Sequence, residues 1–179
     1  AIVIDDFGFR QDMIAEFAAI RRPFTFAVLP FKQYSKEAAA KGLASGHQVM
    51  LHLPMEPLSG IDPSELSSTV KLDMDLAQVR ELVDRATADL PGITGVNNHQ
   101  GSRATADRKT MENVMKVLRE KQLFFVDSRT HARSVAADIA RQQKIKTTEN
   151  DLFLDGIADV AYVKKQLRTA GEMALRQGS

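Results

Sequence analysis

Two histidines and a pair of adjacent carboxylates are the residues of this sequence best suited to chemistry. Asp5 and Asp6 directly follow an apolar run, and His52 and His99, far along the chain, each lie at the end of another one. Two imidazoles and one carboxylate form a ligand set that zinc favours when a fourth position is left open for water. Such a site makes hydroxide available near neutral pH and can polarise a carbonyl oxygen. Asp6, His52 and His99 therefore predict a divalent metal site, with zinc as the preferred ion.

Asp5, next to the predicted ligand Asp6, could take a proton from such a water as a general base. Side chains of adjacent strand residues point to opposite faces, so the two acids are expected to have different roles. Arg103 or Arg129 could pair with Asp5 and keep it ionised. The alternatives are that one acid caps the following helix while the other is solvated, and that both arginines are ordinary surface charges.

Three further polar residues are candidates for the same site. Glu56 lies four residues after His52 and could be a fourth ligand or contact a substrate, while Asn98 and Asp127 each follow an apolar run. A single histidine at a strand end is more often a hydrogen-bonded structural residue, and His47 is expected to be one. The joint pattern of acids and imidazoles at several strand ends therefore carries the prediction of a site.

The segments around these residues alternate between strand-like and helix-like patterns. Apolar runs with β-branched and aromatic residues predict strands, and apolar residues at helical spacing predict helices between them. The predicted strands are 1–4, 24–29, 47–53, 93–96, 123–126 and a weaker one at 145–148; the predicted helices begin near residues 9, 33, 75, 107, 134 and 160. The run 1–4 shows no alternation, so we expect it to be buried on both faces. The alternation predicts an α/β fold with a parallel sheet.

The positions of the polar residues favour a (β/α) barrel over an open sheet. They follow apolar runs at four separate C-terminal ends, and such convergence is typical of a barrel mouth. No Gly-rich turn follows the first run and no phosphate-loop lysine motif is present, which disfavours nucleotide-binding folds. The segment 54–74 holds three prolines and has no clear periodicity. Loops of this length are usually functional or disordered, so we expect it to form a wall of the site.

Length and composition restrict the classes of protein to consider. The 179 residues suit one domain, and a formal net charge of +1 gives no argument for nucleic acid or an anionic membrane surface as the partner. Because cysteine is absent, disulfides and thiolate metal sites are impossible. No apolar run approaches membrane-spanning length. The sequence starts inside a predicted strand and stops just after a predicted helix, so a single domain over 1–179, truncated at both ends, is expected.

Five motifs of the sequence resemble the divergent polysaccharide deacetylase family, in the same order and over nearly the whole chain. They are Ile4-Asp-Asp-Phe-Gly8, Gly46-His-Gln-Val-Met-Leu-His-Leu-Pro-Met-Glu-Pro57, Asn97-Asn-His-Gln-Gly-Ser-Arg103, Phe125-Val-Asp-Ser-Arg-Thr130 and Asp151-Leu-Phe-Leu-Asp155. This family is a remote branch of the NodB-like carbohydrate esterases, which have a distorted (β/α) barrel. Those enzymes use a divalent metal, usually zinc, to remove acetyl groups from N-acetylated sugars. The resemblance implies this barrel, a polysaccharide partner and a periplasmic or cell-envelope location.

Carried over position by position, the resemblance implies that Asp5 is the general base, Asp6 the metal-binding aspartate and His52 the first histidine of the esterases' His-x-x-x-His motif. Glu56 stands in place of the second histidine, and the Arg-x-Pro-Tyr motif of the esterases is missing. We therefore expect His99 as the replacement nitrogen ligand, with Glu56 as its rival. The family's later Gly-His-Pro motif, with the general-acid histidine, lies beyond this sequence, so the last barrel strand is expected to be missing.

Two functions from different classes follow from these observations. The first is a metal-dependent hydrolase that removes N-acetyl groups from a polysaccharide such as an envelope glycan. The second is a non-catalytic glycan-binding or envelope-assembly module on a degenerate esterase fold, which the loss of the second histidine and of the groove motif favours. A metal hydrolase for another ester or amide is a third, weaker alternative.

Overall fold

The computed structural model describes residues 1–177, which form two compact units. The larger unit comprises residues 2–149 and contains all six strands of the described chain. The smaller unit comprises Ala1 and the described residues from Asn150 onward. A single domain over 1–179 stays a prediction.

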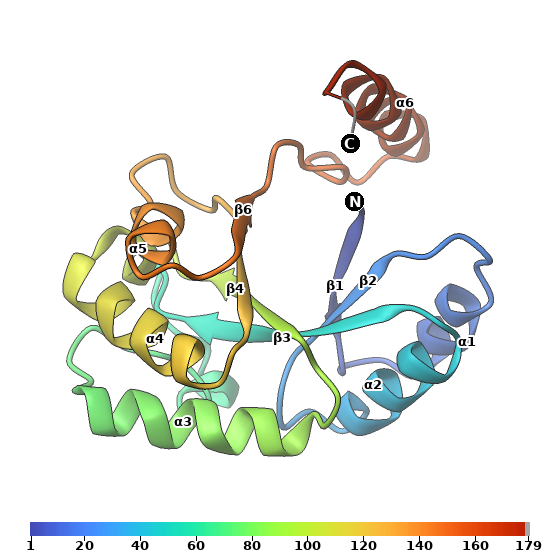
Figure 1. Cartoon of the computed structure of the whole chain (residues 1–179). Helices are drawn as coiled ribbons and strands as arrows, with labels where there is room; N and C mark the ends of the chain where they lie inside the picture. The colour runs from blue at the N-terminus through green and yellow to red at the C-terminus, as the bar shows by residue number, and fades with distance from the viewer. Residues whose placement is uncertain (178–179) are drawn as a thin grey trace. The chain divides into compact units, whose positions relative to one another are not determined.

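The larger unit is built on one sheet of six parallel strands (Figure 1). They are β1 (Val3–Phe7), β2 (Thr25–Val28), β3 (Gln48–Met55), β4 (Gly95–Gln100), β5 (Phe124–Asp127) and β6 (Thr147–Glu149). Each strand pairs with the next one along the chain, so the sheet order is β1-β2-β3-β4-β5-β6. This sequential order is that of (β/α) barrels, whereas doubly wound sheets reverse direction. The predicted α/β fold is confirmed, and closure into a barrel stays a prediction.

Helices follow the strands as the sequence predicts. They are α1 (Asp12–Ala18), α2 (Ser35–Ala44), α3 (Leu76–Asp89), α4 (Arg108–Glu120) and α5 (Ala136–Gln142), with short 3-10 helices η1 (Pro63–Glu65) and η2 (Ala104–Ala106). Helix α3 packs against α4, and α4 against α5 (Figure 1). A capping box starts α3: the Asp75 side chain accepts from the Gln78 backbone N–H, and the Gln78 side chain accepts from that of Asp75. This box fixes where the helix begins.

The core of the larger unit lies around the middle strands and the inner faces of the helices. All residues of β2 and all of β3 except Gln48 are buried. Continuous apolar runs predict such strands, because both faces of a parallel sheet are covered. Strand β1 is different: it lies at an edge of the described sheet, and Val3 and Ile4 are only half-buried. The expectation that the first strand is buried on both faces is wrong.

The smaller unit consists mainly of helix α6 (Val160–Gln177). The carboxylate of Asp159 accepts a hydrogen bond of 2.7 Å from the backbone N–H of Tyr162, which caps the first turn. The sequence predicts a helix beginning at Val160, and this is confirmed. None of the helices in the part of the chain that the structure describes is both long and apolar enough to cross a membrane.

Candidate metal centre

The two acids of β1 lie at an irregularity of the strand. The pairing register with β2 shifts between Ile4 and Phe7, and Asp6 has a φ of 59°. A left-handed residue breaks the alternation of side chains, and aspartate adopts this conformation more readily than most residues. Asp5 Oδ2 and Asp6 Oδ1 consequently lie near the same atom, His52 Nε2, at 3.7 and 3.4 Å. The prediction that the two acids point to opposite faces is wrong.

The two histidines come from neighbouring strands, β3 and β4. In the parallel register His52 is opposite Asn97, and His99 lies two residues beyond Asn97. Residues two apart on a strand share a face, so these three side chains project from the same side of the sheet. Both strands run further than predicted, β3 to Met55 and β4 to Gln100. The histidines therefore lie within the C-terminal parts of the strands and not after them.

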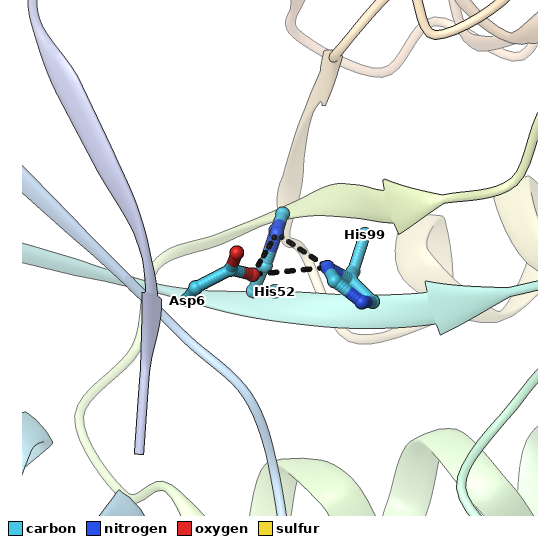
Figure 2. A group of neighbouring side chains, drawn as sticks. All are labelled: Asp6, His52 and His99. Carbon is cyan, nitrogen blue, oxygen red and sulfur yellow. Dashed lines mark hydrogen bonds and ion pairs between the residues drawn. The ribbon is translucent and has the colours of Figure 1, made fainter. Parts of the chain in front are cut away.

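Asp6, His52 and His99 bring three potential ligand atoms together (Figure 2). Asp6 Oδ1 lies 3.4 Å from His52 Nε2 and 3.0 Å from His99 Nδ1, and the two imidazole nitrogens are 3.1 Å apart. Ligand atoms about 2.0–2.1 Å from one tetrahedral zinc ion lie about 3.3 Å from one another. The three separations fit a single ion with three protein ligands and one open position.

The outer nitrogen of each imidazole faces an acceptor. His52 Nδ1 lies 2.9 Å from Asn97 Oδ1, and His99 Nε2 lies 3.5 Å from Glu65 Oε2. Amide and carboxylate oxygens only accept, so they favour N–H groups on the outer nitrogens and leave lone pairs on the inner ones. The inner nitrogens and the Asp6 oxygen are then three acceptors that face one another. A cation between them would remove this repulsion, so the donor set fits a metal ion.

The two imidazoles favour the charged form of the Asp6 carboxyl group. Hydrogen bonds from His52 and His99 hold its pKa well below the usual range for aspartate, although partial burial acts in the opposite direction. Asp6 Oδ1 lies 3.4 Å from His52 Nε2 and 3.0 Å from His99 Nδ1, so the side chains that would share an ion with Asp6 also favour its charged form. Asp6 itself offers a charged ligand without first having to lose a proton.

Three of the other predicted site residues form ion pairs of their own. Arg103 Nη1 donates to Glu56 Oε1 at 2.6 Å, and Glu56 Oε2 also accepts from the backbone N–H of Leu72 at 3.0 Å. Arg129 pairs with Glu149 at 3.3 Å. The structure thus places Glu56 with Arg103 and the loop backbone, while His99 stands among the three ligand atoms.

The remaining two predicted residues are buried and hold the backbone after β4 and β5. Asn98 Oδ1 accepts a hydrogen bond of 2.8 Å from the backbone N–H of Ser128. Asp127 accepts one from the backbone N–H of Arg129 at 2.8 Å and one from the hydroxyl of Ser134 at 2.6 Å. Both residues therefore shape the loop that follows β5, and Asn98 also donates a hydrogen bond of 2.8 Å to the backbone carbonyl of Gln100 in β4.

Sequence reasoning missed three residues that support the cluster: Asn97, Glu65 and Lys32. Asn97 could have been found, because it precedes His99 by two residues and therefore shares its face of the strand. Glu65 and Lys32 gave no such signal. They form an ion pair of 3.1 Å across two different loops, and only the folded chain brings them together. Glu65 belongs to η1 in the segment 54–74, which was expected to form a wall of the site.

Fold and cluster together define an α/β domain with a candidate metal centre in the C-terminal parts of its strands. The chain belongs to the divergent polysaccharide deacetylase family, whose model matches residues 2–179. The family resemblance of the sequence motifs is thereby confirmed.

Two relatives align with the whole of this chain, and one solved structure aligns with nearly all of it. An uncharacterized protein of Haemophilus influenzae is 36% identical over 179 residues, and the uncharacterized protein YibQ of Escherichia coli is 35% identical over 179 residues. Both alignments cover 100% of this chain, which spans 63% and 56% of the length of these relatives. The crystal structure of an uncharacterized protein from Agrobacterium tumefaciens C58 matches 99% of this chain and 73% of its own, with a TM-score of 0.87 and 23% identity. This likeness supports the fold.

Proposed function

We propose that this domain is a metal-dependent hydrolase that removes N-acetyl groups from a polysaccharide. Membership of the divergent polysaccharide deacetylase family supports a carbohydrate substrate. The observation that carries the proposal is the cluster of Asp6, His52 and His99, whose ligand atoms lie within 4.8 Å of one another. Zinc is the proposed ion because two imidazoles, one carboxylate and an open position match its catalytic ligand sets. The proposed setting is the periplasm or cell envelope, where such glycans occur.

Each residue of the cluster has a defined task in this proposal. A bound zinc ion supplies an activated water and polarises the acetyl carbonyl group. Asp6, His52 and His99 hold the ion, and Asn97 fixes the ring of His52 through its outer nitrogen. Asp5 is the proposed general base, because its carboxylate lies beside the cluster and its side chain is 54% exposed, so water and substrate can reach it.

The test is acetate release from N-acetylated chitooligosaccharides and peptidoglycan by the zinc-loaded protein. We expect turnover by the wild type, no turnover by His99→Ala, and zinc binding without turnover by Asp5→Asn. Circular dichroism confirms that each variant is folded. A wild type that binds glycan and zinc but releases no acetate would contradict the hydrolase and favour a non-catalytic glycan-binding module. Turnover of a different ester or amide, with none of the glycans, would also contradict the proposed substrate class.

A further inference from the structure

A buried ion pair lies next to His99, beyond the three proposed ligands. Glu65 Oε1 is 3.1 Å from Lys32 Nζ, and the side chains of these residues are only 6% and 11% exposed. The second oxygen, Glu65 Oε2, is 3.5 Å from His99 Nε2. We propose that Glu65, held in place by Lys32, is a positioning residue that orients His99 toward the metal. This inference deepens the proposed metal-binding function and rests on it.

The two ring nitrogens of His99 have different partners. Its Nδ1 is 3.0 Å from Asp6 Oδ1 and 3.1 Å from His52 Nε2, whereas its Nε2 faces Glu65. A ring turned by half a rotation about χ2 would lose the nitrogen that faces the other ligands. A carboxylate on the outer N–H of a ligand histidine fixes the ring, places the proton on the outer nitrogen and makes the inner one more basic. Glu65 is placed to do all three.

The carboxylate of Glu65 is presented by a well-defined turn. It belongs to η1, where Asp62 Oδ1 accepts from the backbone N–H of Ser64 at 2.8 Å. The backbone carbonyl of Glu65 in turn accepts hydrogen bonds from the hydroxyls of Ser68 and Thr69, at 3.0 and 2.7 Å. These hydrogen bonds fix the backbone in the middle of the segment 54–74, and they thereby fix the position of the Glu65 carboxylate next to His99.

Lys32 is also fixed on more than one side. Besides its contact with Glu65, its ammonium group lies 4.5 Å from the centre of the Phe9 ring. A cation over an aromatic face is attracted by the ring electrons. Lys32 therefore neutralises Glu65 from one side and leaves the second carboxylate oxygen for His99.

A gain in folding stability does not by itself explain why a buried ion pair is present at this position. Desolvation offsets most of the attraction between buried charges, and replacing both partners by apolar side chains of similar volume is often neutral or stabilising. A carboxylate that positions a ligand has a different consequence when it is removed: metal affinity falls. The double variant Lys32→Met/Glu65→Met separates the two roles, because it removes both charges and leaves neither unpaired.

The experiment measures zinc affinity by competition with a chromophoric chelator, together with urea unfolding of the metal-free protein. We expect the double variant to unfold close to the wild type but to bind zinc about 10- to 100-fold more weakly. Glu65→Gln, which keeps an acceptor for His99, is expected to recover part of this loss. The cobalt-substituted double variant is expected to show an altered visible absorption spectrum, because the orientation of a ligand ring has changed.

The control is the double variant Arg80→Met/Glu120→Met, which removes an ion pair between α3 and α4. It should bind zinc like the wild type. Unchanged zinc affinity and an unchanged cobalt spectrum in Lys32→Met/Glu65→Met would overturn the positioning role while leaving the metal centre intact. A wild type that binds no zinc would instead overturn the proposed function and this inference with it, so the two failures are distinguishable.

Discussion

Replacement of Asn97 by alanine is expected to weaken zinc binding without touching a ligand. Asn97 Oδ1 lies 2.9 Å from His52 Nδ1, and both residues are buried, with 3% and 2% of their surfaces exposed. Asn97→Ala leaves a buried N–H of His52 without its acceptor, and such a loss costs about 1–3 kcal/mol. Loss of an outer partner of a ligand histidine typically lowers metal affinity about 10- to 100-fold. At about 1.4 kcal/mol per factor of ten, this loss of affinity corresponds to about 1.4–2.8 kcal/mol of binding free energy, and the folding penalty comes in addition to it.

The neighbouring residue offers a matched control. Asn98 is equally buried and its amide group also makes hydrogen bonds, to the backbone of Gln100 and Ser128, yet none of these reaches an imidazole. Zinc affinity is measured by chelator competition, and stability by urea unfolding, for both alanine variants. Both are expected to lose stability, and only Asn97→Ala to lose much zinc affinity. Equal losses of affinity in the two variants would refute the argument, because they would trace the effect to general damage to β4.

Three further perturbations test other parts of the account. Asp5→Asn is expected to bind zinc within a few-fold of wild type but to release acetate at least about 100-fold more slowly, since it lacks the general base; equal rates would exclude this role. Asp107→Ala removes the cap of α4 and should cost about 1 kcal/mol in urea unfolding at pH 7. Hydrogen bonds from the Thr110 side chain and backbone lower the pKa of Asp107. The stabilisation that the Asp107 cap contributes is therefore fully present above the unfolded-state pKa of about 3.9. It is lost as the pH falls through the lower folded-state pKa. The difference between the two proteins should therefore shrink toward pH 3, and a pH-independent difference would contradict the assignment. Gly95→Ala would place its Cβ 2.3 Å from the Phe124 ring and is expected to lower stability by about 1–3 kcal/mol in thermal unfolding; an unchanged melting temperature would show that the ring can move aside.

Most of the fold could be predicted because its signals are local. The apolar run of β2, the helical spacing in α4 and the capping box at Asp75 each depend on residues close together in the chain. The choice of Asp6, His52 and His99 as neighbours also followed from local signals, since each lies near the end of an apolar run and parallel strands carry such residues to one edge.

The remaining features depend on contacts between distant parts of the chain. The left-handed conformation of Asp6 arises where the pairing of β1 with β2 shifts register, and no local pattern indicates this shift. The support of His99 by Glu65 and Lys32 links β4 with two loops, and loops lack the periodicity that makes strands and helices recognisable. The extension of β4 beyond residue 96 likewise came from pairing with β3, since Asn97 and Asn98 are poor strand formers.

The location of the bound ion tests the central claim most directly. Crystals of the zinc-loaded protein, measured above the zinc absorption edge, should show one anomalous difference peak about 2.0–2.2 Å from Asp6 Oδ1, His52 Nε2 and His99 Nδ1. The peak should be absent from crystals of a His52→Ala variant grown under the same conditions. A peak at other residues, or none at the cluster of the wild type, would contradict the assignment of this cluster as the metal centre.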